Sequence, residues 1–298
     1  MEFQDMAFNP FANTNWNLAH NRQLNLGHQA VVMGILNITP DSFSDGGSFM
    51  APKAAIAAAR AMVEEGARII DIGGESTRPG AVAIDAETEK RRVLPVIRTI
   101  ARESNIIISV DTYRAETAKA AISEGAHIIN DVWGLQKDPE MAQTVADMRA
   151  GLVVMHTGRE RNVLDDPFDD QTLFLNRSLD IAKKAGISKN AIVLDPGIGF
   201  AKDMKINLAL MNGLKKLHRF GYPLLIGTSR KRFLGTITGH ENASARDAAT
   251  SATSVIARMN GAAIFRVHNV AINNDALQVA DALLHANGKI NDRHNQQL

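Results

Sequence analysis

The chain has 298 residues, of which 45% are hydrophobic, 33 are Lys or Arg and 32 are Asp or Glu. This near-neutral balance gives no global attraction to nucleic acid or anionic membrane, and the lack of cysteine excludes disulfides, thiolate nucleophiles and sulfur-ligated metals. The opening residues carry no basic stretch followed by a long apolar run, and no apolar run approaches about 18 residues. We therefore expect a cytoplasmic globular protein that binds neither nucleic acid nor membrane.

The first 30 residues precede a repeating pattern and form an N-terminal extension, in which residues 16–27 predict a hairpin that caps one end of the fold. From residue 31 onward, short apolar runs alternate with amphipathic helical patterns. The runs are continuous rather than alternating, which is typical of parallel strands covered on both faces. The expected strands span residues 31–36, 68–72, 106–110, 127–130, 152–155, 192–194, 223–226 and 263–267.

The expected helices lie between and after these strands, at residues 53–65, 86–103, 115–124, 139–149, 171–184, 205–220, 243–260 and 274–286. Several of them stop at a glycine just before the next strand, such as Gly66 and Gly125, as connections from helix to strand prefer. Eight strand–helix units predict an α/β fold, a single-domain (β/α)8 TIM barrel over residues 31–290 with a polar tail at 291–298. An open doubly wound sheet is the alternative architecture.

Polar or charged residues follow all eight expected strands. The active site of such a barrel lies at the C-terminal ends of its strands, so these residues form a candidate set. The set is Asn37, Asp71, Asp111, Asn130, His156, Asp195, Ser229 with Lys231, and Arg266 with His268. Strands also end in polar residues simply because loops are solvated. That explanation accounts poorly for carboxylates, amides, cations and histidines gathered at one end.

Two of the carboxylates, Asp111 and Asp195, follow strongly apolar strands, so we expect both to be partly buried. A buried carboxylate needs hydrogen-bond donors. A flat heterocycle with an amino group and a ring N–H supplies them, as the 2-amino-4-oxo edge of a pterin does, and Asn130 can donate or accept beside it. For Asp111 alone, capping of the following helix is an equally good explanation.

The cations near the last two strands suggest an anion site. Lys231 lies in TSRKR, where it could form a Schiff base, donate to a carbonyl or bind phosphate, although a basic run is more commonly a solvated loop. Arg266 and His268 occupy alternating positions of an extended segment and so point the same way. That pair favours an anionic ligand.

Two glycine-containing loops follow the first two expected strands, with the sequences NITPDSFSDGGSF and GGESTRPG. Neither has the spacing of a P-loop. Their glycines suit mobile lids over an active site, but they are equally consistent with two ordinary flexible loops.

Five segments resemble the dihydropteroate synthases: GILNITPDSFSDGG (34–47), DIGGESTRPG (71–80), LDPGIGFAK (194–202), GTSRKRFLG (227–235) and RVHNV (266–270). The resemblance runs in order from about Val31 to Ala286. It implies a transferase of folate biosynthesis. This enzyme condenses a dihydropterin-methyl diphosphate with 4-aminobenzoate, which gives dihydropteroate and diphosphate. It also implies a homodimer, a Mg²⁺ cofactor and small-molecule substrates as the other partners.

The resemblance implies the following roles, position by position. The pterin would contact Asp111, Asn130, Asp195, Lys231 and Arg266; the diphosphate would contact Asn37, Arg78, Arg266 and His268, with Mg²⁺ at Asn37; and 4-aminobenzoate would contact Phe43, Thr77, Pro79 and Phe200. Asp45, Lys231, Arg266 and His268 would be catalytic, with Asp45 stabilising positive charge on the pterin methylene.

The chain departs from the family pattern at the segment MHTGRE (155–160), at Ile198, at Arg232 and at Asn269, which stands where Asp is frequent. These departures leave open the substrate affinity and the sensitivity to sulfonamides. The alternatives are a pterin-binding methyltransferase, which would not need Arg78 and His268, and a catalytically silent paralogue, which should have lost a lid or diphosphate residue. An aldolase-type barrel that uses Lys231 as a Schiff base is a third.

Overall fold

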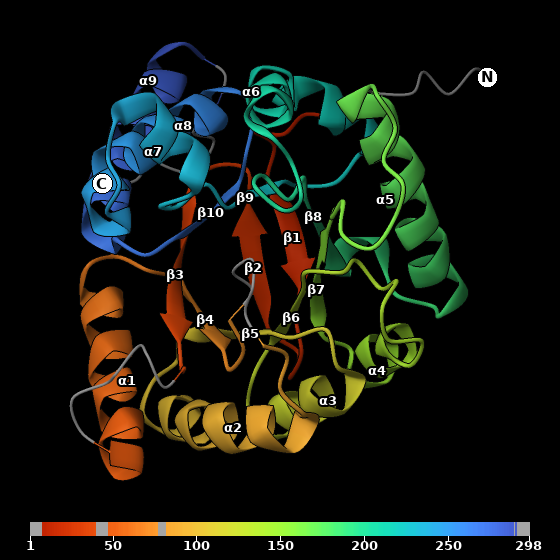
Figure 1. Ribbon diagram of the computed structural model, residues 1–298, viewed down its shortest axis with the longest axis vertical. Helices are drawn as coiled ribbons and strands as arrows, with labels where there is room; N and C mark the ends of the chain where they lie inside the picture. Colours follow the sequence, from red (N-terminus) through yellow and green to blue (C-terminus); the bar gives the residue numbers. More distant parts are fainter. Residues whose placement is uncertain (1–7, 40–46, 77–81, 289, 291–298) are drawn as a thin grey trace, which may run out of the picture.

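Eight parallel strands form one sheet in the computed structural model, which describes residues 8–39, 47–76, 82–288 and 290. In spatial order the strands are β8 (Ile192–Asp195), β7 (Gly151–Met155), β6 (Ile128–Asp131), β5 (Ile107–Asp111), β4 (Ile69–Gly73), β3 (Val31–Asn37), β10 (Ile264–Val267) and β9 (Leu225–Ile226). A bridge between Leu194 of β8 and Leu224, just before β9, closes the sheet into a barrel. The (β/α)8 prediction is confirmed and the open doubly wound sheet is wrong (Figure 1).

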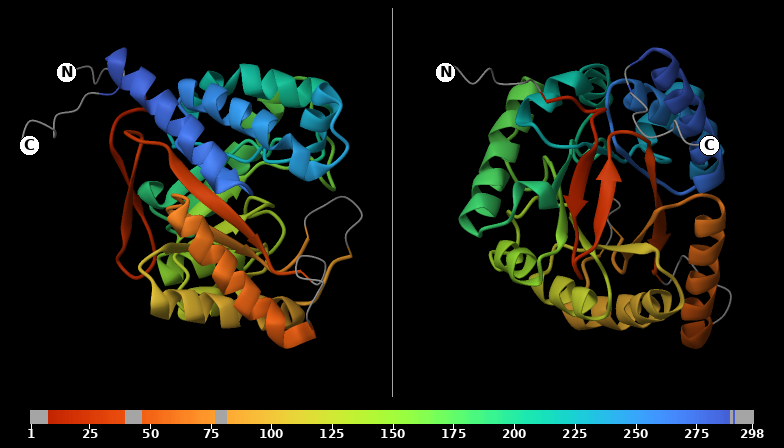
Figure 2. Two further views of the ribbon diagram at one scale, coloured as in Figure 1. Left: turned by 90° about the vertical axis from the view of Figure 1, so that its left-hand side faces the viewer. Right: turned by 180° about the vertical axis from the view of Figure 1, so that it is seen from behind.

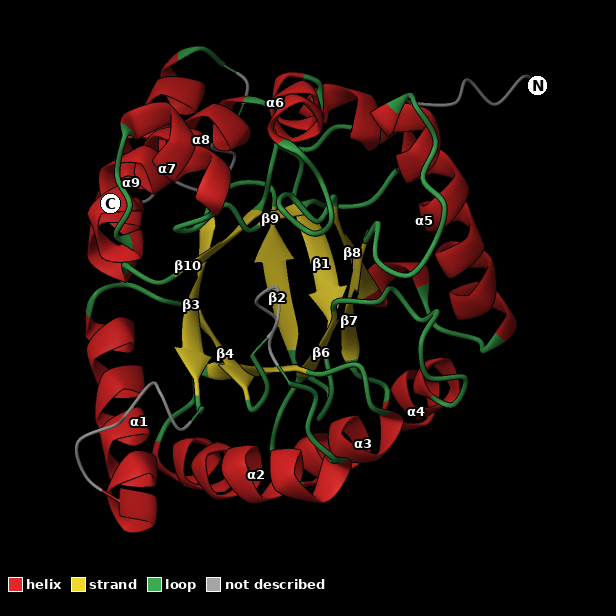
Figure 3. Ribbon diagram, viewed as in Figure 1, coloured by secondary structure: helices red, strands yellow, loops and turns green. Residues whose placement is uncertain are grey.

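Helices surround the barrel and cover the outer faces of its strands (Figure 3). The α-helices in the described residues are α1 (Gly47–Glu64), α2 (Ala86–Glu103), α3 (Ala115–Ser123), α4 (Met141–Met148), α5 (Pro167–Lys184), α6 (Met204–Asn212), α7 (Arg232–Thr238), α8 (Asp247–Met259) and α9 (Val270–Ala286). None of these helices combines the length and apolar character needed to span a bilayer.

Two expected helices are broken, and one helix was not predicted. The helix expected at 205–220 divides at Gly213, the C-cap of α6, into α6 and a 3-10 helix, η3 (Leu214–Phe220). A Cβ at Gly213 would lie 2.2 Å from the Phe168 ring of α5, so the packing there requires glycine. The one expected at 243–260 divides into η4 (Ala243–Arg246) and α8. The seven-residue α7 begins at Arg232, the last residue of the basic TSRKR run, for which a solvated loop was the commoner interpretation.

Three helices begin earlier than predicted. Asp166 caps α5, accepting from the N–H groups of Phe168 (2.8 Å) and Asp169 (3.0 Å), with a proline at the first helical position. Asp-Pro is a strong start signal that the hydrophobic pattern does not contain. Asn269 caps α9 in the same way, and α1 begins at Gly47 rather than at residue 53.

The hairpin expected at 16–27 consists of β1 (Thr14–Asn17) and β2 (Gln23–Leu26), paired antiparallel. It lies across the end of the barrel where the strands begin (Figure 2). Trp16 is buried there and donates from Nε1 to the carbonyl of Ala191 at 2.8 Å. Trp16, Leu18 and Leu24 join a buried cluster with residues that begin the strands, such as Ile107. This floor leaves the opposite end of the barrel for a ligand.

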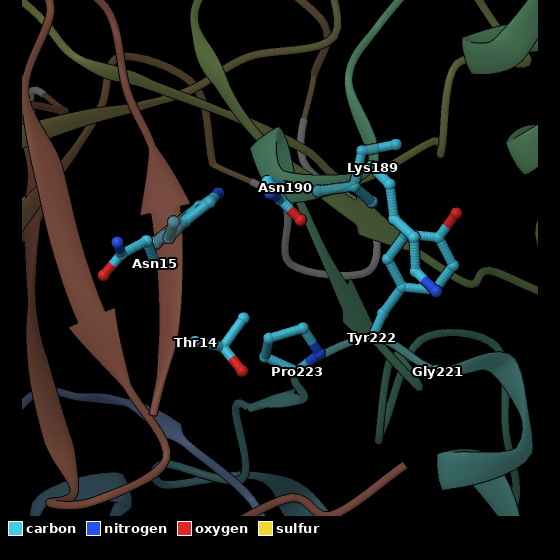
Figure 4. Close-up of a pocket in the computed structure, with 9 residues that line it drawn as sticks. Thr14, Asn15, Lys189, Asn190, Gly221, Tyr222 and Pro223 are labelled. Carbon is cyan, nitrogen blue, oxygen red and sulfur yellow. The ribbon is translucent and has the colours of Figure 1, made fainter. Parts of the chain in front are cut away.

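Two hollows border the hairpin at this N-terminal end. The smaller, of about 20 Å³, lies between Thr14, Lys189 and Tyr222 and is shown in Figure 4. The larger, of about 390 Å³, lies between the hairpin and α4 and includes Arg22 and Arg149. Neither is lined by any of the polar residues that end the barrel strands, so we look for the active site at the other end.

Candidate active site

The strand-end residues meet at one mouth because all eight strands run parallel. Across neighbouring strands, Gly73 pairs with Asp111, and Asp111 pairs with Asn130. The predictions for Phe43, Asp45, Thr77, Arg78 and Pro79 lie outside the described residues and stay predictions.

Arg266 lies at the centre of this mouth, between two carboxylates. Its Nε donates to Asp71 Oδ2 and its Nη2 donates to Asp111 Oδ2, both at 2.6 Å. Asn130 donates from Nδ2 to the same Asp71 oxygen at 3.1 Å. Asp71 was in the predicted strand-end set without an assigned role, and it proves to be the residue that orients both Arg266 and Asn130. Its position inside a buried strand, between Ile70 and Ile72, was the available signal.

Burial sets the ionisation of these groups. It raises the pKa of Asp111 to about 7, against the opposing charge of Arg266, and it also raises the pKa of Asp195, against Lys231. Burial lowers the pKa of Lys231 to about 7. Burial also disfavours the charged Arg266, but Asp71 and Asp111 more than offset this and raise its pKa. A ligand that donates N–H groups to Asp111 and Asp195 would therefore stabilise their charged forms.

The loop after β8 is fixed by close backbone contacts. Asp195 Oδ1 accepts from the N–H of Gly197 at 2.7 Å. Gly197 has φ +63°, and a Cβ there would lie 1.8 Å from the carbonyl oxygen of His156, so only glycine fits. Lys202 Nζ donates to the carbonyls of Gly197 (2.8 Å) and Phe200 (3.2 Å). Lys202 lies in the segment LDPGIGFAK, but no role was predicted for it. Its contacts hold the loop that carries Phe200.

Two cations flank the ring of Phe200. Lys231 Nζ lies 4.3 Å from its centroid and donates to the carbonyl of Ile198. The guanidinium carbon of Arg159 lies 4.8 Å from the same centroid. A Cβ at Gly199 would come within 2.6 Å of Lys231 Cδ, so this glycine lets the lysine chain cross the loop. The mouth thus joins an aromatic surface to positive charge.

His268 is oriented by Ser229. Ser229 Oγ accepts from the backbone N–H of His268 at 3.0 Å and lies 2.9 Å from its Nδ1. If Ser229 donates its hydroxyl hydrogen to Nδ1, the ring carries a hydrogen on Nε2. That tautomer offers an N–H donor, which suits an anion.

Asn269, which was expected to depart from the family pattern, makes two side-chain hydrogen bonds. Its Oδ1 accepts from the N–H of Ile272 at 3.2 Å, which caps α9, and its Nδ2 donates to Asp247 Oδ2 at 3.0 Å. Asp247 also accepts two hydrogen bonds from Arg230, at 2.7 and 2.8 Å. An aspartate at position 269 could cap the helix but could not donate to Asp247.

His156, which ends β7, is part of a supporting cluster. It is buried, and its Nε2 lies 2.9 Å from Asp170 Oδ2, while Arg161 donates to the other Asp170 oxygen at 2.8 Å. Burial lowers the pKa of His156 to about 4, so the ring is neutral at pH 7. We interpret it as a structural residue beneath the β7 loop.

The family resemblance implies a Mg²⁺ site at Asn37, the last residue of β3. Asn37 is paired with Gly73, and its amide oxygen lies 3.5 Å from the point that a Cβ of Gly73 would occupy. Within residues 8–39, 47–76, 82–288 and 290, no group of three or more His, Asp or Glu side chains could hold a metal ion. A single amide oxygen fits Mg²⁺ bound chiefly by water and ligand phosphate, rather than a cage built by the protein.

Comparisons with known proteins find similar sequences and similar structures. The model of the family described as pterin binding enzyme matches residues 33–268. The dihydropteroate synthase of Bacillus subtilis is 45% identical over 265 residues, covering 89% of this chain and 92% of its own. A Clostridium difficile dihydropteroate synthase solved in the presence of pteroic acid is 43% identical, with TM-score 0.85, covering 87% and 98%. A Xanthomonas albilineans dihydropteroate synthase with 4-aminobenzoic acid is 41% identical, with TM-score 0.86, covering 91% and 98%.

Proposed function

The chain belongs to the pterin-binding enzyme family, among the dihydropteroate synthases, and from that premise we propose how its barrel mouth performs the reaction. The substrates are (7,8-dihydropterin-6-yl)methyl diphosphate and 4-aminobenzoate, and the products are 7,8-dihydropteroate and diphosphate. The observation that supports the mechanism best is the meeting of Asp111, Asn130 and Arg266 in one hydrogen-bonded network around Asp71.

The pterin edge is held by Asp111, Asn130 and Asp195, with Lys231 donating to its carbonyl oxygen. Charge-assisted hydrogen bonds of this kind contribute about 1.5–3 kcal/mol each. Arg266 stacks on the pterin face. Its N–H groups donate to Asp71 and Asp111 within the plane of the guanidinium group. The flat face of the group is therefore left for stacking on the pterin ring.

The diphosphate is received by Asn37, Arg78, Arg266 and His268. Cleavage of the methylene–oxygen bond builds negative charge on the leaving group, so the oriented N–H donor of His268 stabilises the transition state. Mg²⁺ beside Asn37 supplies Lewis-acid stabilisation of the same charge when it is bound. Asp45 is assigned to the positive charge that develops on the methylene.

The second substrate occupies a pocket formed by Phe43, Thr77, Pro79 and Phe200. An aryl amine is a neutral nucleophile, so the step needs no general base. It does need water to be excluded, because water would otherwise react with the methylene cation. The Lys202 contacts that fix the Phe200 backbone support a preformed wall for this pocket.

Assembly and location also remain proposals. A homodimer formed through the late helices is supported by Ile256 of α8 and by Val279 and Leu283 of α9, which are 50%, 62% and 52% exposed. Light scattering tests it. The cytoplasmic location stays a prediction.

Product analysis separates the proposed reaction from its alternatives. Incubation with both substrates and Mg²⁺ should give 7,8-dihydropteroate on a chromatogram, and chelation of the metal should abolish it. Methyl transfer from methyltetrahydrofolate would instead support the methyltransferase. Pterin binding without either product would support the silent paralogue. Borohydride trapping of a carbonyl compound on Lys231 would support the aldolase.

A further inference from the structure

Arg159 lies in the MHTGRE segment, after β7, where the chain departs from the family pattern. The backbone fixes this segment against Phe200: the N–H of Gly158 donates to the Phe200 carbonyl at 3.4 Å, and a Cβ at Gly158 would lie 2.8 Å from the carbonyl oxygen of Ala201. The N–H of Arg159 donates to Thr157 Oγ1 at 3.2 Å. The position of the guanidinium group over the Phe200 ring therefore follows from the packing of two loops.

Arg159 interacts electrostatically with two residues of the candidate active site, Asp111 and Lys231. Burial lowers its pKa, while Asp111, Glu160 and Tyr113 act in the opposite direction. Arg159 in turn helps to lower the pKa of Lys231. The two cations thus share one region, and an anionic group placed between them would be attracted by both.

The location of Arg159 indicates which anionic group it binds. In the closed barrel, β7 lies four strands from β3, which places it on the opposite side from Asn37. The proposed diphosphate site comprises residues of β3 and β10 and of the segments that follow β4 and β10, whereas Arg159 lies beside Phe200, a residue of the proposed 4-aminobenzoate pocket. The amine of that substrate must face the pterin methylene, so its carboxylate points toward the outer part of the mouth.

We propose that Arg159 binds the carboxylate of 4-aminobenzoate and thereby selects an acidic second substrate. This inference rests on the proposed function. Loss of a charge-assisted hydrogen bond corresponds to a decrease in affinity of about 10- to 100-fold. The affinity should decrease for 4-aminobenzoate alone, because the proposed diphosphate site lies on the opposite side of the barrel.

The test compares Arg159→Gln, Arg159→Lys and a control, Lys189→Gln. Lys189 is an exposed cation that lies 5.2 Å from the centroid of the Tyr222 ring at the N-terminal end of the barrel, outside the proposed machinery. The glutamine at 159 should raise KM for 4-aminobenzoate about 10- to 100-fold and change KM for the pterin diphosphate less than about twofold. The lysine should give an intermediate value, and Lys189→Gln should match the unmodified protein.

A neutral nucleophile shows whether the carboxylate is what Arg159 recognises. The ratio of kcat/KM for 4-aminobenzoate to that for 4-aminobenzamide should fall in Arg159→Gln by the same factor as the affinity. Equal losses for both nucleophiles, or a rise in KM for the pterin diphosphate alone, would overturn the proposal. If the unmodified protein showed no turnover, the proposed function would fail by itself. Calorimetric binding of 4-aminobenzoate to the same variants would still decide the role of Arg159.

Discussion

Replacing Arg266 by methionine would leave two buried carboxylates without their shared cation. The Arg266 side chain is 18% exposed, Asp71 is fully buried and Asp111 is 7% exposed, so solvent screens the pair weakly. Removing one partner of a buried ion pair costs about 3–5 kcal/mol. With an unfolding entropy of about 2.1 cal/mol/K per residue, that cost lowers the Tm of this 298-residue chain by about 5–8 °C.

The decrease in Tm caused by Arg266→Met should become larger as pH rises. The pKa of Asp111 is already raised to about 7 by burial, and without Arg266 it rises further. A carboxyl group with a raised pKa binds more protons in the native state than in the unfolded chain, so its contribution to stability falls as pH rises. The difference in Tm between the unmodified protein and Arg266→Met should therefore be larger at pH 8 than at pH 6.

Differential scanning calorimetry at both pH values tests this, with Arg258→Met as the control. Arg258 is a buried arginine paired with a single carboxylate, Asp281, at 2.5 Å and outside the barrel mouth. The control should lower Tm but keep full pterin affinity, whereas Arg266→Met should lower both. A Tm loss below about 2 °C, or one that is equal at the two pH values, would refute the reasoning about the network.

Three further changes test the rest of the site. Lys231→Met should weaken pterin binding about tenfold and make the affinity rise more steeply between pH 6 and 8, because deprotonation of the lysine no longer opposes the ionisation of Asp111; calorimetry measures both. Gly197→Ala should cost roughly 2 kcal/mol or more in urea unfolding, since its Cβ would meet the His156 carbonyl; an unchanged midpoint would contradict that clash. Asn269→Asp should lower stability by about 1–2 kcal/mol through repulsion from Asp247, and a second change, Asp247→Asn, should restore most of it in thermal melts.

The barrel could be predicted from the sequence because each strand is an unbroken apolar run ending in a polar residue. Two errors in the helices were readable from the sequence. Gly213, a common type of helix C-cap, ends α6 inside the expected 205–220 helix, and Asp166 with the proline after it starts α5 early. The contact that requires a glycine at 213 was not readable, because a Cβ there would meet the ring of Phe168 on another helix.

The meeting of Asp111, Asn130 and Arg266 could be predicted because strand ends converge by topology, and their pterin roles stay proposals. The residues that support it could not, since their roles depend on how far a side chain reaches. Asp71 is directed inward and orients Arg266. Lys202 extends back along its own loop to two carbonyls, and Arg159 crosses from the β7 loop to the ring of Phe200.

The most direct test of the account is the release of diphosphate from the dihydropterin-methyl diphosphate by the purified protein with Mg²⁺, measured with and without 4-aminobenzoate. We predict that diphosphate release depends on 4-aminobenzoate and is strongly reduced in Asp111→Asn. Binding of the pterin without condensation, or full activity in Asp111→Asn, would contradict the assignment of this barrel mouth.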